Sequence, residues 1–179
     1  MFDTIRADIA RKRELYAANK GWLSRKVFIY LLPGSLAVII YRFGRWVFLL
    51  KIPVLKQILT LVYLPLKALM VICFGITIPV RADYGKGFVI HCYSGIFLPR
   101  TKAGVNLTVN QEVTVGGAFQ GGQPVMGDNV FLGAGAKVIG KIRIGNNVIV
   151  GANSLVVADV PDNCTVVGVP ARVVFRKKA

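Results

Sequence analysis

The sequence predicts a mainly β protein, a solenoid of short parallel strands that follows an N-terminal helical region. The first supporting observation is a six-residue period that persists through six consecutive units from Met126 to Pro161. Each unit opens with an aliphatic residue or Met, and Gly follows in four of the six. A helix requires apolar spacing near 3.6 and a single strand requires spacing of two, so the period fits neither alone. It indicates stacked coils with a continuous core, turned at the corners by Gly or Asn.

Composition and charge are the other two observations. Of the 179 residues, 54% are hydrophobic and only 17% are charged, which excludes a disordered chain. The formal net charge of +15 favours an anionic partner: a membrane surface, a nucleic acid or a phosphorylated ligand. Cys73, Cys92 and Cys164 have no CxxC spacing, so we expect neither disulfides nor a metal site. The first 20 residues carry three acidic residues and no apolar core, which argues against a secretory signal and for a cytoplasmic protein.

Residues 3–18 are expected to form the first helix, because Ile5, Ile9 and Leu15 recur at near-helical spacing before a break at Lys20-Gly21. Residues 27–80 are expected to form apolar, basic helices. Their longest uncharged runs, 27–41 and 68–80, fall short of the roughly 18–20 residues of a membrane span. Their recurring basic and aromatic residues favour binding in the plane of an anionic membrane surface. Two alternatives stay open: packing on the solenoid and on neighbouring subunits, or a true span.

The six-residue frame is expected to begin before the regular stretch, with openers at Tyr84, Ile90, Ile96, Ala103, Val109 and Val115. One extra residue, Lys102, shifts it. The next opener, Met126, follows Val115 by eleven residues instead of six, which predicts a loop of about five residues within 117–124. We therefore divide the chain into a helical region, 1–80, and a solenoid domain, 81–179.

His91 is the single histidine of the chain and the candidate general base, since no other side chain has an ordinary pKa near neutrality. A structural role is the alternative. If three units form one coil and Lys102 adds one residue, Asn110 lies over His91 with Glu112 nearby, and either is a candidate for holding the imidazole tautomer. Cys92 is a rival nucleophile, but adjacent residues of a strand point to opposite sides. A covalent mechanism through Cys92 is therefore the lesser alternative.

Seven short motifs are spread over nearly the whole chain: IRAD at 5–8, YRFGRW at 41–46, GITIP at 75–79, GKG at 85–87, VTVGG at 113–117, LGAGA at 132–136 and GVPAR at 168–172. With them the chain resembles the serine O-acetyltransferase branch of the hexapeptide-repeat acyltransferases, especially short members associated with polysaccharide biosynthesis. The resemblance implies a left-handed parallel β-helix, a homotrimer with active sites between subunits, and acetyl-CoA in a groove beneath the loop. A histidine base removes the acceptor proton in this family, without a covalent acyl-enzyme.

The chain departs from the family pattern on the acceptor side. His91 stands where the family has Asp, and Cys92 stands where it has the catalytic His. Either the base has moved by one residue to His91, or the family's usual base is absent. Gln123 replaces a second histidine, and Ile76 or Thr77 replaces an upstream carboxylate. These losses weaken serine as the acceptor.

The cofactor side of the pattern is kept. Small residues are expected to let the pantetheine arm of acetyl-CoA pass close to the backbone, and they are Gly116, Gly117, Gly133, Ala134, Gly151 and Ala152. Arg172 and the basic tail, 176–178, are expected to bind the nucleotide phosphates.

The sequence thus predicts an acetyl-CoA-dependent O-acetyltransferase that is trimeric, cytoplasmic and peripheral at the inner face of the cell membrane through residues 1–80. The preferred acceptor is a sugar hydroxyl of a polysaccharide or lipid-linked precursor, and free serine is the alternative. A non-catalytic trimeric membrane scaffold is a second alternative. Nucleic-acid binding is not expected, because the basic residues concentrate among apolar helices and form no known binding motif.

Overall fold

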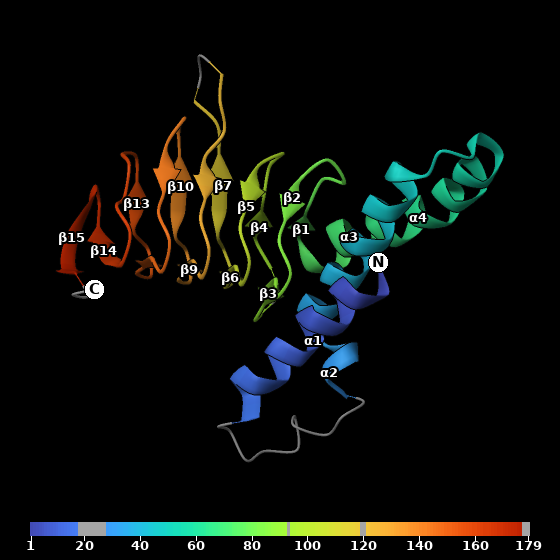
Figure 1. Ribbon diagram of the computed structural model, residues 1–179, viewed down its shortest axis with the longest axis horizontal. Helices are drawn as coiled ribbons and strands as arrows, with labels where there is room; N and C mark the ends of the chain where they lie inside the picture. The colour runs from blue at the N-terminus through green and yellow to red at the C-terminus, as the bar shows by residue number, and fades with distance from the viewer. Residues whose placement is uncertain (18–27, 93, 119–120, 177–179) are drawn as a thin grey trace.

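The computed structural model describes residues 1–17, 28–92, 94–118 and 121–176, and in these ranges helices lead into a parallel β-helix (Figure 1). The helices are α1 (Phe2–Ala17), α2 (Phe28–Leu31), α3 (Pro33–Leu49) and α4 (Pro53–Phe74). The first sheet contains β1 (Ile76–Thr77), β4 (Ile96–Phe97), β7 (Thr114–Gly116), β10 (Lys137–Ile139) and β13 (Leu155–Val156). The second sheet contains β2 (Asp83–Tyr84), β5 (Lys102–Ala103), β8 (Val125–Met126) and β11 (Arg143–Ile144). The third contains β3 (Val89–Ile90), β6 (Thr108–Val109), β9 (Phe131–Leu132), β12 (Ile149–Val150), β14 (Cys164–Gly168) and β15 (Ala171–Arg176).

The register of the strands confirms the six-residue frame. Leu132 pairs with Val150 eighteen residues later, whereas Val109 pairs with Leu132 twenty-three residues later. The difference of five residues is the insertion predicted between Val115 and Met126. The one-residue shift at Lys102 is also confirmed, since Ile90 pairs with Val109 at an interval of nineteen.

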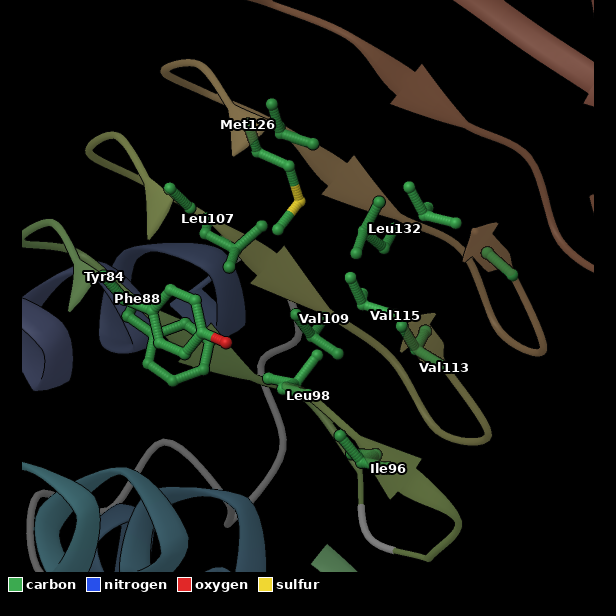
Figure 2. Packing of buried hydrophobic residues seen from close by; sticks show 14 of the residues in the cluster. Tyr84, Phe88, Ile96, Leu98, Leu107, Val109, Val113, Val115, Met126 and Leu132 are labelled. Atoms are coloured by element: carbon green, nitrogen blue, oxygen red, sulfur yellow. The ribbon is translucent and has the colours of Figure 1, made fainter. Parts of the chain in front are cut away.

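The opening residue of every unit points into one continuous core (Figure 2). Asn residues turn one corner of successive coils in the left-handed backbone region, which Asn tolerates better than most residues. Their φ values are 62° at Asn106, 55° at Asn129, 54° at Asn147 and 61° at Asn163. The side-chain amides of the first three each donate to the Asn of the next coil over 2.9 Å, so the corner carries its own hydrogen-bonded ladder.

The bounds of the N-terminal helices can be compared with those predicted from the sequence. The helix predicted at 3–18 is confirmed as α1, while the break at Lys20-Gly21 lies outside the described residues, as do 119–120 of the loop and 177–178 of the tail. α3 and α4 each begin at a proline, a residue suited to the first helical turn. The division of the chain at residue 80 stays a prediction, and coil structure begins with β1 at Ile76.

α4 corrects the expectation that no stretch reaches the length of a membrane span. It has 22 residues and, within the described part of the chain, is the helix long and apolar enough to cross a membrane by length and composition. A search for uncharged runs missed it, because the helix continues through Lys56, Pro65 and Lys67.

Candidate active site

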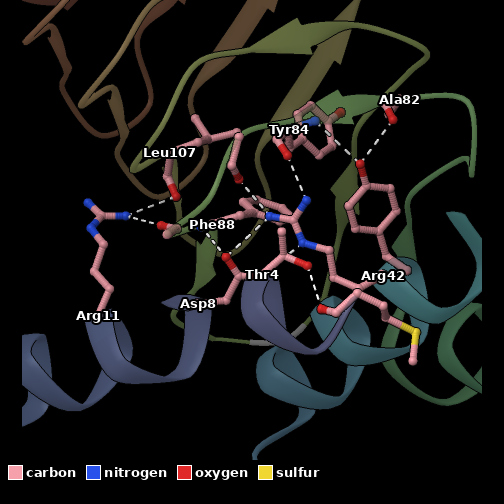
Figure 3. Close-up of polar contacts among 12 residues, drawn as sticks. Thr4, Asp8, Arg11, Arg42, Ala82, Tyr84, Phe88 and Leu107 are labelled. Atoms are coloured by element: carbon pink, nitrogen blue, oxygen red, sulfur yellow. Dashed lines mark hydrogen bonds and ion pairs between the residues drawn. The ribbon is translucent and has the colours of Figure 1, made fainter. Parts of the chain in front are cut away.

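α1 caps the open edge of the third sheet. β3 is the last strand of that sheet, so one side of its backbone has no strand neighbour. Side chains of α1 supply the missing partners. Asp8 accepts from the Phe88 amide at 2.9 Å, Lys12 Nζ donates to the Ile90 carbonyl at 2.8 Å, and the Tyr16 hydroxyl donates to the His91 carbonyl at 3.1 Å. Arg11 donates to the Gly87 and Leu107 carbonyls (Figure 3).

α3 caps the second sheet in the same way, at its edge strand β2. Arg42 donates to the carbonyls of Tyr84 and Gly85 at 2.6 Å each, and the Tyr41 hydroxyl donates to the Ala82 carbonyl at 2.9 Å. Arg42 Nε also binds Asp8 of α1 at 2.8 Å, with 5% and 1% of the two side chains exposed (Figure 3). This buried ion pair fixes both helices to the first coil.

His91 follows β3 directly and is half-buried beneath α1. Its Nδ1 lies 3.3 Å from the Tyr16 hydroxyl oxygen. Since that hydroxyl donates its proton to the His91 carbonyl, its oxygen is left to accept from Nδ1–H. This assignment leaves Nε2 unprotonated, which is the form that a general base needs.

The surroundings of His91 also keep it neutral. Burial lowers the pKa of His91 from its ordinary value of 6.5, and the positive charges of Lys12 and Arg11 lower it further. Lys12 itself is 2% exposed, and burial lowers its pKa from 10.5 to about 8. Among the described residues, neither His91 nor Lys12 has a carboxylate within ion-pair distance. The neutral imidazole is therefore the form expected at physiological pH.

The positions predicted for the orienting residues are only partly as expected. Asn110 does lie on the coil beside His91, because Ile90 pairs with Val109 and the His91 amide donates to the Val109 carbonyl at 3.0 Å. Its side-chain amide, however, donates to the Leu132 carbonyl at 2.9 Å. Glu112 is exposed at a turn with φ of 60°.

The side chain that contacts the imidazole is instead Tyr16, which sequence reasoning missed because it lies 75 residues away on α1. A signal was present: Asp8, Lys12 and Tyr16 recur at intervals of four in a predicted helix, which places three polar residues on one face. Cys92 is exposed with a free thiol, so its role as a nucleophile stays a prediction.

The small residues proposed for acetyl-CoA fall at two corners of the solenoid. Gly133 and Gly151 follow β9 and β12, so they continue the column that His91 and Asn110 begin after β3 and β6. Neighbouring strands lie about 4.8 Å apart, so this column extends roughly 14 Å from His91 to Gly151. Coil stacking also requires small residues here, because a Cβ on Gly133 would lie 2.7 Å from the Ala152 amide nitrogen.

Gly116 and Gly117 lie elsewhere: Gly116 ends β7 and Gly117 follows it, at the corner where the loop leaves the first sheet. Arg172 is exposed on β15 and pairs with Val167 of β14, which lies beside Gly151, so Arg172 is near the Gly151 end of the column. Within a single chain, Gly116 and Gly117 therefore lie at a different corner from the other five residues.

A groove of about 510 Å³ lies where the loop meets the second sheet. Its lining includes Gly122 and Gln123 from the loop, Val125 of β8, Lys141, Arg143 of β11 and Asp159. Lys141 and Arg143 are both exposed and cationic, a property suited to phosphates. Neither was singled out from the sequence, where isolated basic residues in a repeat give no signal.

Comparison with known proteins adds to this geometry. Residues 123–158 match the family model for the bacterial transferase hexapeptide with six repeats. The chain is 36% identical to a serine acetyltransferase of Synechococcus elongatus over 180 residues, which cover 98% of this chain and 70% of the relative. A serine acetyltransferase of Synechocystis is also 36% identical, over 97% of this chain and 68% of its own.

The chain belongs to the serine acetyltransferase family. Among solved structures, the serine acetyltransferase of Neisseria gonorrhoeae superposes with a TM-score of 0.80 at 30% identity, over 99% of this chain and 66% of that one. A serine acetyltransferase solved with CoA superposes with a TM-score of 0.78 at 29% identity, over 96% of this chain and 68% of that one. The chain thus spans about two thirds of the length of these relatives.

Membership of the serine acetyltransferase family confirms the β-helix fold, the acyltransferase class and acetyl-CoA as the donor. It also corrects one expectation. The relatives reported above are serine acetyltransferases, so the narrower placement among members associated with polysaccharide biosynthesis has no support from them.

Proposed function

We propose that this protein transfers the acetyl group of acetyl-CoA to a hydroxyl group, with serine as the first candidate acceptor. The observation that carries the proposal is the half-buried imidazole of His91, held at Nδ1 by Tyr16 at the head of a column of small residues. Serine as the acceptor is supported by its relatives, one of which, from Neisseria gonorrhoeae, was solved in complex with serine.

In the proposed mechanism, Nε2 of His91 removes the proton of the acceptor hydroxyl as its oxygen attacks the thioester carbonyl. The tetrahedral intermediate then expels the CoA sulfur as a thiolate, which accepts the proton from the imidazolium. An oxygen–carbon bond forms, a carbon–sulfur bond breaks, and no acetyl group is attached to the enzyme. Tyr16 keeps Nδ1 protonated through the cycle, because its hydroxyl oxygen accepts from that nitrogen.

A trimer would complete the site. Within one chain, His91 lies at the end of the third sheet, whereas the groove with Lys141 and Arg143 lies on the second. We propose that neighbouring subunits bring the groove of one chain beside His91 of the next, so that the donor lies between them. The protein would act in the cytoplasm, as the supply of acetyl-CoA requires.

A sugar hydroxyl of a polysaccharide or lipid-linked precursor is the second candidate acceptor. The positions at which the family resemblance places the acceptor-side His and carboxylate groups hold Cys92, His91, Gln123, and Ile76 or Thr77 in this chain. None of these supplies a carboxylate for the amino group of an amino acid. An acceptor without that amino group would not need one.

The test is release of free CoA from acetyl-CoA with serine or with a panel of sugars, in the wild type, His91→Ala and the neighbouring control Cys92→Ser. Loss of a general base is expected to lower kcat/KM by about 10²–10⁴-fold in His91→Ala. Cys92→Ser should retain activity. An inactive Cys92→Ser beside an active His91→Ala would assign the chemistry to the thiol instead. Absence of both CoA binding and transfer would favour the scaffold.

A further inference from the structure

α4 presents its apolar side chains outward. Only 11% of its most apolar window is buried, and its buried side chains are Tyr63 and Met70. Ten large apolar side chains of the helix are exposed: Val54, Leu55, Ile58, Leu61, Val62, Leu64, Leu66, Leu69, Val71 and Ile72. Its two lysines are half-buried, and Lys56 Nζ turns back to the Phe48 carbonyl of α3 at 2.8 Å. A helix that packs on its own protein would bury the apolar face and expose the lysines.

The exposed surface continues past the start of α4. Trp46, Phe48, Leu49 and Ile52 are exposed at the end of α3 and in the connection to α4. The hairpin of α3 and α4 extends away from the solenoid, so this surface stands clear of the coils (Figure 1). We call these residues and the ten of α4 the hairpin patch. It is larger than the scattered apolar residues found on ordinary protein surfaces.

Positive charge borders the hairpin patch. Lys56 Nζ lies 5.0 Å and the Arg81 guanidinium carbon 5.6 Å from the centre of the Phe48 ring. Lys51 is exposed at the tip of the hairpin. Between residues 15 and 82 the sequence has nine Lys or Arg residues and no Asp or Glu.

We propose that the hairpin patch binds in the plane of an anionic membrane surface. Apolar side chains with bordering cations and an interfacial Trp are the features of helices that lie at such an interface. A second copy of the chain fits less well, because a symmetric contact would bring two basic surfaces without any acidic residue against each other. A span fits less well too, since Met70 of α4 belongs to the core that packs on β1.

The same observations narrow the membrane contact predicted for residues 1–80. α1 and the first turns of α3 pack on the first coil, where Asp8, Arg11, Lys12 and Arg42 hold the backbone of that coil. The charged groups of these residues make their contacts inside the protein and not with a membrane surface. The proposed contact is therefore confined to Trp46–Ile72, and it does not depend on which acceptor the enzyme uses.

The experiment is co-sedimentation of the full chain with vesicles of phosphatidylcholine alone or mixed with phosphatidylglycerol. Binding is expected with the mixed vesicles, weaker with neutral ones, and weaker when salt is raised. Leu61→Glu with Ile72→Glu changes the two most exposed large apolar residues of α4, at 72% and 81%. This double variant should bind at least about tenfold more weakly. The matched control, Val105→Glu with Val157→Glu, adds the same charge to exposed residues of the solenoid and should bind like the wild type.

Wild-type protein that stays in solution with the mixed vesicles at low salt would overturn the proposal. So would equal loss of binding in the control, which would assign binding to net charge alone. If the α4 variant instead changes the oligomeric state in solution without vesicles, the patch covers a second copy. CoA release with a soluble acceptor should be unchanged in both double variants, which separates this test from that of the proposed function.

Discussion

The burial of Lys12 between α1 and β3 leads to a prediction about stability and pH. The pKa of Lys12 is about 8 in the folded protein and 10.5 ordinarily. The unfolded chain therefore binds more protons than the folded one between these values, so the free energy of unfolding rises with pH in this window. The cost of burying the ammonium is fully present below pH 8 and is gone above pH 10.5. Its size, from the shift in pKa, is about 3 kcal/mol.

Lys12→Met isolates this cost. The wild type should gain about 2 kcal/mol of stability from Lys12 between about pH 7.5 and about pH 9.5, and the variant should not. The stability advantage of Lys12→Met over the wild type should therefore shrink by that amount across the window. Lys12→Met also removes the hydrogen bond to the Ile90 carbonyl. That loss changes the stability difference between variant and wild type equally at low and high pH, because the neutral amine of the wild type still donates.

The assay is urea unfolding followed by circular dichroism, at several pH values and one fixed protein concentration, because an oligomer's stability depends on concentration. Lys102→Met is the control, since it makes the same substitution at an exposed residue of β5. A difference between Lys12→Met and the wild type that stays constant from about pH 7.5 to about pH 9.5 would refute the reasoning. It would mean that Lys12 is solvated and that α1 does not cap β3 as the structure has it.

Three further predictions concern the same cap. Tyr16→Phe removes the hydroxyl from Nδ1 of His91 and should lower kcat by about 3–10-fold with little change in KM, as expected for one neutral hydrogen bond; an unchanged kcat would exclude Tyr16 as the positioning residue. The acid limb of the pH–rate profile should have its midpoint below 6.5, because burial and two cations lower the pKa of His91, and Lys12→Met should move it to higher pH. Asp8→Asn leaves Arg42 buried without its counter-ion and should cost about 3–5 kcal/mol in urea unfolding; a cost below about 1 kcal/mol would indicate that the pair is solvated.

The coils were predictable from the sequence because each unit repeats the same local requirement. An apolar residue must point inward every six residues, and a residue that tolerates positive φ must turn the corner. The insertion was predictable for the same reason, since Met126 resumes the frame five residues late. The length of α4 was not predictable from uncharged runs, because its two lysines are half-buried within the helix, with Lys56 donating to α3, and do not end it.

The candidate site shows which contacts a sequence repeat can predict and which it cannot. Stacking placed Asn110 beside His91 correctly, because coil register depends only on counting residues. The contact to Nδ1 comes instead from Tyr16, and counting along coils cannot reach a helix that precedes them. The motifs 5–8 and 41–46, which carry part of the family resemblance, have a structural explanation: Asp8, Tyr41 and Arg42 satisfy the backbone of the edge strands. A first coil with an uncovered edge would expose unpaired backbone groups, so a β-helix of this kind needs its helical cap whatever acceptor it uses. The acceptor is therefore to be sought in the residues at which this chain departs from its family, beginning with His91 and Cys92.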